Sequence, residues 1–258
     1  MISIITPSYN QSDFIEKNIL SVICQNYPDV EHIVVDGGST DQSVQILQKY
    51  DHLKWISEKD RGQSHAINKG FRRAIGDIIG WLNSDDVYMP GTFFKVERIF
   101  EKHPDVDLIF SHCLRIDADD RVLSMAQGRD PERYDVLKYP NYIPQPTVFF
   151  RNKIFQTTGY LFEEYQYVMD FDYWRRISKH HKLMLVNDIF AAFRIHGDSK
   201  TGKFERHFKH ESKISFFRNG GHIRTPYYYE KFIKPKLLNL FIYNPLIKKI
   251  FFSNLPIV

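Results

Sequence analysis

Four short β-branched runs alternate with four amphipathic segments through the first hundred residues, and this alternation limits the fold more than any other feature. Apolar residues spaced three and four apart predict helices, whereas short apolar runs bounded by turn residues predict buried strands. The predicted strands lie at 2–6, 31–35, 53–57 and 78–82, and the predicted helices at 11–25, 39–50, 63–74 and 91–102. Strict strand–helix alternation favours an α/β domain with a mostly parallel central sheet and helices on both faces.

The pattern becomes less regular in the second half of the chain. Strands are predicted at 106–110, 144–150 and 183–193, a hairpin with an acidic turn near 114–123, and helices at 153–158 and 173–181. Two helical segments follow residue 204, separated by Asn219, Gly220 and Gly221. We therefore expect one domain over residues 1–202 and a C-terminal helical extension over residues 203–258.

The 258 residues are enough for one large domain with an appendage. Cys24 and Cys113 lie in apolar segments, so a disulfide framework is not expected and a reducing cytoplasm fits. No apolar run is long enough to predict a membrane-spanning helix. The first residues lack the basic region of a signal peptide. The expected location is therefore cytoplasmic.

The C-terminal extension differs in charge from the rest of the chain. After residue 202 there are 11 Lys and Arg residues against three Glu and no Asp, together with many Phe and Tyr residues. No nucleic-acid recognition motif accompanies these cations, so nucleic acid is not an expected partner. A basic, aromatic segment suits an anionic membrane surface, and a helix that packs on the domain is the alternative.

Polar residues gather where each of the four predicted strands ends, at 6–10, 36–39, 58–63 and 83–86. Each cluster alone is typical of turns and helix caps. Because the carboxyl ends of parallel strands meet at one edge of a sheet, the four together predict a ligand-binding crevice. Its carboxylates would repel a phosphate unless a divalent cation were bound. The chain has neither G-x-G-x-x-G after the first strand nor a P-loop motif, so dehydrogenase and P-loop functions are not expected.

Four motifs at these strand ends, TPSYN, VVDGGSTDQS, DRGQSHAINKG and WLNSDD, resemble in order and spacing those of family 2 glycosyltransferases with the GT-A fold. The resemblance is strong over residues 1–100 and looser to about residue 200. It implies an inverting enzyme that moves a sugar from a nucleotide donor to a hydroxyl group. It also implies a nucleotide-binding half at 1–100 and an acceptor-binding half at 101–202.

The resemblance further implies a nucleotide pocket for a UDP-sugar. Tyr9 would stack on the base and Asp36 would accept a hydrogen bond from uracil N3–H, with a packed aromatic and a helix cap as the respective alternatives. Asp60 and Arg61 would lie near the base and the ribose. The implied nucleotide-binding residues are Thr6, Pro7, Tyr9, Asp36, Asp60, Arg61 and Ser84.

The WLNSDD motif resembles the family's metal-binding D-x-D element, with Asn83 in place of the usual first Asp. Asp85 is therefore the main implied metal ligand, and Asp86 would support it or contact the sugar. His196, in a later R-x-H element, would bind the metal or the diphosphate. Oxygen ligands of this kind imply Mn²⁺ or Mg²⁺ as the cofactor.

A second acidic motif at 169–176, M-D-F-D-Y-W-R-R, resembles the family's acceptor-side E-D-x-D-x-W-x-R element. Asp170 matches the general base that takes the proton of the acceptor hydroxyl, and an N-cap role is the alternative. Met169 stands where the family has Glu, and Asp172 is expected to cap or orient the helix. Residues 145–147 are expected to shape the sugar or acceptor site.

These features predict an inverting, metal-dependent glycosyltransferase that acts on a glycan or a lipid-linked glycan. Cell-surface polysaccharide synthesis, such as O-antigen assembly, at the cytoplasmic face of a membrane would use such an enzyme. Two alternatives stay open. A sugar-phosphate nucleotidyltransferase would need a Gly- and Arg-rich loop after the first strand, and TPSYN is not one. A non-catalytic carbohydrate-binding protein is the other, because Asn83 and Met169 depart from the family pattern.

Overall fold

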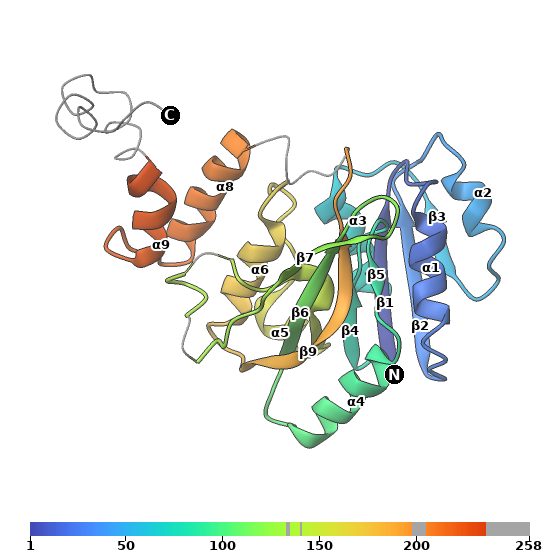
Figure 1. The fold of residues 1–258 in the computed structure, drawn as a ribbon, viewed down its shortest axis with the longest axis horizontal. Coiled ribbons are helices and arrows are strands. Elements are labelled where there is room, and N and C mark those ends of the chain that lie inside the picture. Colours follow the sequence, from blue (N-terminus) through green and yellow to red (C-terminus); the bar gives the residue numbers. More distant parts are fainter. Residues whose placement is uncertain (133–134, 140, 198–204, 236–258) are drawn as a thin grey trace, which may run out of the picture.

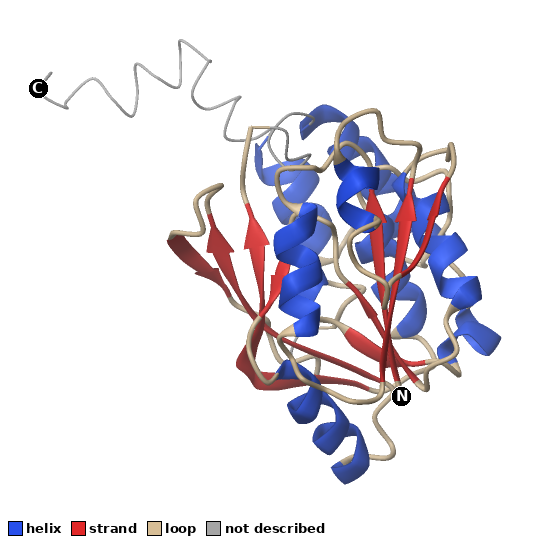
Figure 2. Cartoon of the chain, turned by 90° about the vertical axis from the view of Figure 1, so that its right-hand side faces the viewer, coloured by secondary structure: helices blue, strands red, loops and turns tan. Residues whose placement is uncertain are grey.

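The computed structural model of the chain describes residues 1–132, 135–139, 141–197 and 205–235. A central sheet runs through the molecule and helices cover both of its faces (Figure 1, Figure 2). The described residues form nine strands in this sheet: β1 Ile2–Ser8, β2 Val30–Asp36, β3 Lys54–Ser57, β4 Ile78–Trp81, β5 Val87–Tyr88, β6 Leu108–Ile116, β7 Val122–Ala126, β8 Phe149–Arg151 and β9 Leu183–Arg194. The predicted α/β fold with helices on both faces of the sheet is confirmed.

Most helices lie within the segments where the apolar spacing predicts them, and α1 illustrates the reason. Ile15, Ile19 and Val22 lie three and four residues apart, so they share one buried face of this helix. The helical elements of the described residues are α1 Ile15–Ile23, α2 Ser43–Leu47, α3 Gln63–Arg73, α4 Thr92–Lys102, the 3₁₀ turn η1 Gln145–Thr147, α5 Ile154–Thr158, α6 Met169–Ile177, α8 Glu205–Arg218, α9 Pro226–Tyr228 and the π-helical turn η2 Tyr229–Ile233.

The first half of the sheet is parallel throughout. The strands β3, β2, β1 and β4 lie side by side in this order. Ser8 at the end of β1 pairs with Asp36 at the end of β2, which pairs with Ser57 at the end of β3. The carboxyl ends of these three strands are therefore level, and the loops that follow them lie at one edge of the sheet.

The second half of the sheet is mixed and brings the end of β9 to the loop after β4. The strand β8 runs antiparallel to both β4 and β6, and β9 runs parallel to β6. The two-residue strand β5 follows the loop after β4 and pairs antiparallel with Ala191 and Ala192 of β9. Residues 83–86 and the residues that follow β9 are therefore neighbours in space.

Alternate residues of each strand contribute to different apolar cores. Ile4 of β1 belongs to the core that includes Val22 of α1 and Phe93 of α4. Ile5, the next residue, belongs to the core that includes Ile67 of α3 and Trp174 of α6. Because successive strand residues point to opposite faces, this division places α1 and α4 on one side of the sheet and α3 and α6 on the other.

One helix and one strand are among the predicted elements that differ from the structure. The helix predicted at 173–181 begins at Met169, because Phe171, Trp174 and Ile177 form its buried face. The strand predicted at 144–150 starts with the 3₁₀ turn η1, and only Phe149–Arg151 joins the sheet. Pro146 has no N–H to donate to a strand neighbour, which explains the turn.

The described part of the C-terminal extension, residues 205–235, packs on the domain. Phe216 of α8 and Tyr227 of α9 are buried in the core that includes residues of α6. Figure 1 shows α8 next to α6. This arrangement is the alternative that the sequence left open for the extension, while residues 236–258 lie outside the described residues. Among the described residues, no helix combines the length and the apolar character needed to span a bilayer.

Candidate active site

The loop after β2 is fixed by the carboxylate of Asp36, which is fully buried at the end of the strand. Its Oδ2 accepts hydrogen bonds from the N–H of Ser39 at 2.9 Å and from the hydroxyl of Ser57 at 2.7 Å. Its Oδ1 accepts the hydroxyl of Ser39 at 2.5 Å. Asp36 therefore ties its own loop to the end of β3, and the hydrogen bond to a base predicted for it stays a prediction.

Three of the predicted nucleotide-binding strand ends meet at Gly37. A Cβ added to Gly37 would lie 2.5 Å from Oδ2 of Asp60 and 3.4 Å from Cδ2 of Tyr9. A side chain at this position would therefore crowd the carboxylate of Asp60, whereas its contact with Tyr9 would be ordinary. Tyr9 is 59% exposed, so its ring is available to a planar ligand. The exposed Arg61 forms an ion pair with Glu163 at 2.5 Å.

Thr6 does not line this crevice, which argues against the nucleotide contact predicted for this residue. Thr6 is fully buried, and its hydroxyl lies 3.4 Å from Oδ1 of Asn18 and 2.9 Å from Nε2 of His32. The alternation of β1 explains this position, since Thr6 shares a face with the core residue Ile4. The other two predicted contacts from these loops, Pro7 and Ser84, are also buried.

Asn18 of α1 supports the acidic loop at 83–86. Its amide donates hydrogen bonds to the main-chain carbonyl oxygens of Asn83, at 2.8 Å, and Asp86, at 3.0 Å. Asn18 is fully buried on the otherwise apolar face of α1. A buried amide among aliphatic residues needs partners, so its position between Ile15, Ile19 and Val22 was the signal in the sequence that could have identified it.

Asn83, which replaces the usual Asp of the D-x-D element, is the centre of an amide network. Its Oδ1 accepts hydrogen bonds from Nε2 of Gln63 at 2.8 Å and from Nε1 of Trp81 at 3.0 Å. Its Nδ2 donates to Oε1 of Gln145 at 3.1 Å and faces Oδ2 of Asp86 at 3.5 Å. A carboxylate could not donate to either oxygen, so these surroundings explain the asparagine.

The end of β9 holds His196 against Asp85. Nε2 of His196 lies 3.1 Å from Oδ2 of Asp85, and both side chains are partly accessible. The fully buried Arg194 donates from its main-chain N–H to Oδ1 of Asp86 at 2.9 Å and from Nε to the carbonyl oxygen of Asp85 at 2.8 Å. Alternate residues of an extended chain point the same way, which explains the R-x-H spacing.

The carboxylate of Asp86 faces the protein interior. It is fully buried, and its two oxygens meet the N–H of Arg194 and the amide of Asn83. Burial away from water, and secondly the neighbouring Asp85, raise the pKa of Asp86 well above its ordinary range. Both oxygens of Asp86 are therefore engaged inside the protein, and the supporting role or sugar contact predicted for this residue stays a prediction.

The donor set at this loop fits a hard divalent cation that completes its shell with substrate. No group of three or more Asp, Glu, His or Cys side chains suited to a metal occurs among the residues that the structure describes. One carboxylate oxygen of Asp85 and one imidazole nitrogen of His196 nevertheless lie 3.1 Å apart, close enough to bind one ion. Mg²⁺ and Mn²⁺ commonly bind through one or two protein ligands plus phosphate oxygens and water, so this pair is compatible with such a site.

Asp170 lies in the first turn of α6 and is half-buried. Burial raises the pKa of its carboxyl group to about 6, although the main-chain N–H groups of Phe171 and Asp170 act in the opposite direction. The amide of Asn141 lies 3.3 Å from Oδ2 of Asp170. A carboxyl group with this pKa is mostly ionised at neutral pH and is a stronger base than an ordinary Asp.

Met169 and Asp172, two other residues of this motif, make contacts inside the protein. Met169, which stands in place of Glu, is buried, and its sulfur accepts the hydroxyl of Ser64 at 3.1 Å. Asp172 is fully buried and accepts a hydrogen bond from Nε of Arg176 at 2.9 Å. The predicted helix-orienting role of Asp172 agrees with this contact inside α6.

One loop, residues 141–147, contacts both acidic motifs. Asn141 contacts Asp170, and Gln145 accepts the amide of Asn83 while donating to the carbonyl oxygen of Trp81 at 2.7 Å. The bridging residues are amides that occur in no motif, so the sequence alone did not identify Asn141. The loop brings the acidic loop at 83–86 and the start of α6 to the same side of the sheet.

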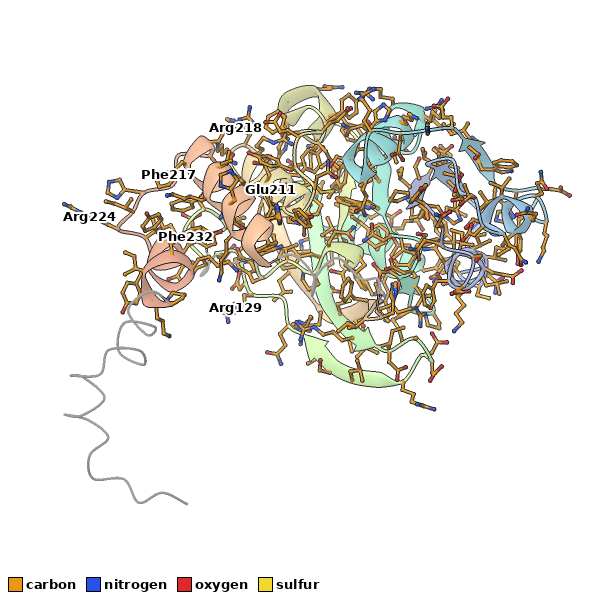
Figure 3. The ribbon with its side chains drawn as sticks, turned by 90° about the horizontal axis from the view of Figure 1, so that it is seen from above. Arg129, Glu211, Phe217, Arg218, Arg224 and Phe232 are labelled. Carbon is orange, nitrogen blue, oxygen red and sulfur yellow. The ribbon has the colours of Figure 1, made fainter. Side chains whose placement is uncertain are left out.

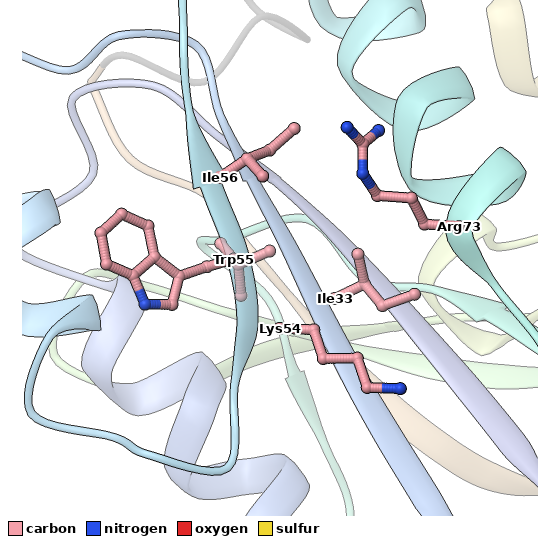
Figure 4. A pocket seen from close by; sticks show the side chains of 6 residues that line it. Ile33, Lys54, Trp55, Ile56 and Arg73 are labelled. Atoms are coloured by element: carbon pink, nitrogen blue, oxygen red, sulfur yellow. The ribbon is translucent and has the colours of Figure 1, made fainter.

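A separate hollow of about 280 Å³ lies at the edge of the sheet formed by β2 and β3 (Figure 4). It is lined by Ile33, Val34, Lys54, Trp55, Ile56 and Arg73. None of the predicted site residues contributes to it. Nζ of Lys54 also lies 2.7 Å from the carboxylate of Glu31, so one of the two cations that line the hollow is neutralised. The hollow is therefore not part of the candidate active site.

Comparisons with known proteins agree with the fold and with the motifs. A protein of Nostoc described as an uncharacterized glycosyltransferase is 32% identical over 136 residues, 51% of this chain and 42% of that protein. Chondroitin synthase of Escherichia coli is 26% identical over 219 residues, 81% of this chain and 32% of that protein. The chain thus spans less than half the length of these two relatives.

Two solved structures share the fold. TarS of Staphylococcus aureus in complex with UDP-GlcNAc has a TM-score of 0.70 at 17% identity and covers 96% of this chain and 74% of its own. A mannosyltransferase of Pyrobaculum calidifontis in complex with GDP-Man and Mn²⁺ has a TM-score of 0.63 at 18% identity, with coverage of 95% and 71%. Residues 3–163, more than half of the chain, match the model of the family described as Glycosyl transferase family 2. With this match, the chain belongs to glycosyl transferase family 2.

Proposed function

We propose that this chain transfers a sugar from a nucleotide-sugar donor to a hydroxyl group of a glycan, with inversion at the anomeric carbon. The observation that carries the proposal is the loop at 141–147, whose Asn141 contacts Asp170 while its Gln145 contacts Asn83 of the acidic loop. A candidate base and a candidate diphosphate site thereby both contact one loop. Single displacement needs these two groups and no further nucleophile.

The donor is a UDP-sugar, bound at the carboxyl ends of β1, β2 and β3. The exposed ring of Tyr9 would stack on the base, and Asp60 would lie beside it across Gly37. Asp36 would accept from the base imide, and Arg61 would lie near the ribose. The complexes of TarS with UDP-GlcNAc and of the Pyrobaculum enzyme with GDP-Man support a nucleotide-sugar in this fold, and the TarS complex supports uridine.

The diphosphate end of the donor would lie at Asp85 and His196, which would hold Mn²⁺ or Mg²⁺. The ion, when bound, neutralises the charge that develops on the nucleoside diphosphate as it leaves. The Mn²⁺ in the Pyrobaculum complex supports this cofactor. Arg194 contributes by fixing the main chain of both loops, because it bonds to the carbonyl oxygen of Asp85 and to the carboxylate of Asp86.

Asp170 acts as the base at the acceptor side. Its carboxylate takes the proton of the acceptor hydroxyl as the oxygen forms a bond to the anomeric carbon and the bond from that carbon to the phosphate oxygen breaks. Attack from the face opposite the leaving group inverts the configuration. A retained configuration in the product, read from the anomeric coupling by NMR, would overturn this mechanism.

The acceptor belongs to cell-surface polysaccharide synthesis at the cytoplasmic face of a membrane, as a glycan or a lipid-linked glycan. The name of the related chondroitin synthase supports a polysaccharide product. The outer face of α8 to η2 supports membrane contact, because cations such as Lys213 and Arg224 lie among exposed apolar side chains. These apolar side chains are Ile214, Phe217, Ile223 and Tyr229. Figure 3 shows Phe217 and Arg224 on this C-terminal part of the molecule.

Membrane contact is tested with vesicles of a zwitterionic lipid alone and with an anionic lipid added. We expect the full chain to sediment with the anionic vesicles and to be released by salt. Ile214→Asp together with Ile223→Asp should weaken this binding, because both side chains are exposed and contribute little to the core. Equal binding by the double variant would exclude the outer face as the contact.

The proposed sugar transfer is tested directly by incubating the chain with a panel of UDP- and GDP-sugars, with Mn²⁺ and with EDTA. We expect metal-dependent release of UDP that increases when acceptor is added. Asp170→Asn should bind the donor and fail to transfer. Family membership argues against the nucleotidyltransferase alternative, whose product would be pyrophosphate. Donor binding without turnover by the native chain, with all acceptors, would support the non-catalytic alternative.

A further inference from the structure

One face of α8 is polar where it meets the domain. Glu211, Ser215 and Asn219 are spaced four residues apart, so they lie on one side of this helix. The carboxylate of Glu211 accepts the N–H of Gln166 on Oε1 at 3.0 Å and the N–H of Tyr167 on Oε2 at 2.8 Å. Figure 3 shows Glu211 on α8, the helix that packs beside α6. This residue therefore fixes the main chain just before α6.

The other two residues of this face contact Asp172. The hydroxyl of Ser215 donates to Oδ1 of Asp172 at 2.9 Å, and Nδ2 of Asn219 donates to the same oxygen at 3.0 Å. The side chains of Asp172, Ser215 and Asn219 are almost completely buried. We call Glu211, Ser215 and Asn219 the polar stripe. The stripe holds the chain at 166–167 and again at 172, and Asp170 lies between these two points.

Ser215 also gives a partner to a buried cation in α6. Arg175 is fully buried and donates from a guanidinium nitrogen to the hydroxyl of Ser215 at 3.2 Å. Its guanidinium carbon lies 3.8 Å from the ring centroid of Phe171 and 4.7 Å from that of Tyr227. Such contacts stabilise a cation that water does not reach. The α8–α9 segment thus surrounds the helix turn that follows Asp170.

Polar contacts of this kind fix position more tightly than apolar packing does. A helix that docks through aliphatic residues can shift its register at small cost, whereas a buried carboxylate or amide that loses its partners is strongly unfavourable. The contacts also extend toward the donor side. A Cβ added to Gly62, which precedes α3, would lie 2.9 Å from Oε1 of Gln166. The segment held by Glu211 is therefore packed against the loop that carries Asp60 and Arg61.

We propose that the polar stripe of α8 positions Asp170 for catalysis, so that the C-terminal extension is part of the catalytic unit and Glu211 is a positioning residue for the transfer step. The inference rests on the proposed role of Asp170 as the base. Displacement of a catalytic group by about 1 Å costs on the order of 100-fold in rate even when the altered residue is distant from the chemistry. The stripe would keep Asp170 within that tolerance.

The test uses the full chain with Glu211→Ala, Glu211→Gln and Asn219→Ala, and His210→Ala as the matched control on the exposed side of α8. Donor affinity is measured by calorimetry with the UDP-sugar, folding by thermal melting, and transfer as kcat and acceptor KM. We expect kcat to fall roughly 10- to 100-fold in Glu211→Ala and Asn219→Ala, with donor affinity unchanged. Glu211→Gln keeps one acceptor oxygen, so its kcat should be intermediate. His210→Ala should match the native chain.

The outcomes separate this inference from the proposed function. A folded Glu211→Ala with native kcat, alongside an inactive Asp170→Asn, would overturn the positioning role and leave the base intact. Native transfer by Asp170→Asn would overturn the proposed function itself. A loss of donor affinity equal to the loss of kcat would indicate general damage and would also overturn the positioning role. If Glu211→Ala does not fold, the isosteric Glu211→Gln decides by the same comparison.

Discussion

Nε2 of His196 lies 3.1 Å from Oδ2 of Asp85, although 111 residues separate them along the chain. The contact exists because β5, directly after the acidic loop, pairs with β9 just before His196. The main chain of both loops is then locked by Arg194. The proximity of these two side chains therefore depends on sheet topology rather than on a local motif.

Removing either member of this pair should change the metal dependence of transfer. We expect Asp85→Asn to lose nearly all metal-dependent activity, and His196→Ala to need about 10- to 100-fold more Mn²⁺ for half-maximal rate. The measurement is a Mn²⁺ titration of UDP release. His180→Ala, which changes an exposed histidine, is the control. An unchanged Mn²⁺ requirement in His196→Ala would remove this residue from the metal site.

Transfer should lose activity as the pH falls through about 6. Burial raises the pKa of Asp170 to about 6, and a general base works only in its deprotonated form. The rate should therefore be constant above this pH and fall about tenfold per pH unit below it. An ordinary Asp, with a pKa of about 3.9, would keep full activity to about pH 5. The measurement is kcat/KM against pH, and a profile that stays flat down to pH 5 would contradict the assignment.

Replacement of Tyr9 should weaken binding of the nucleotide. Its ring is exposed beside Gly37, and stacking of one base on an aromatic ring contributes about 1–3 kcal/mol. We expect Tyr9→Ala to bind UDP about 10- to 100-fold more weakly, with an unchanged melting temperature. Tyr9→Phe keeps the ring and should bind normally. Equal losses in the two variants would assign the effect to the hydroxyl instead of the ring.

Replacing Asn83 by the Asp that is usual in the family should lower both the stability and the activity of this chain. In Asn83→Asp, the donor to Gln145 is lost and a new carboxylate faces Asp86. Loss of a buried partner costs about 1–3 kcal/mol, so the melting temperature should fall by several degrees and transfer should decrease. Asn26→Asp, at an exposed position, is the control. A more active Asn83→Asp would mean that the amide network is dispensable.

The alternation of strands and helices made much of the fold predictable. Apolar spacing identified the parallel half of the sheet, and the polar strand ends predicted a ligand-binding crevice at one of its edges. The alternation of residues along β1 also predicts that Thr6 is buried. With Ile2 and Ile4 on one face of β1, period two places Thr6 on that buried face as well, yet the motif alone suggested a ligand contact.

Contacts between distant polar residues could not be predicted from the sequence. Asn141 and Glu211 lie in no motif, and their partners depend on how the second half of the sheet turns back. The first turn of α6 could not be predicted either, because Asp170 and Asp172 suit a position before a helix as well as one in its first turn. In each case the local sequence is compatible with more than one structure, and tertiary packing determines which one forms.

The polar stripe has a consequence for exchanging parts between relatives. The hydrogen bonds from Glu211 span 45 residues to Gln166, and those from Asn219 span 47 residues to Asp172. A crossover placed between residues 173 and 204 would join two halves whose hydrogen-bonding partners come from different parents. Chimaeras should keep native activity only when residues 166–219 are inherited as one block.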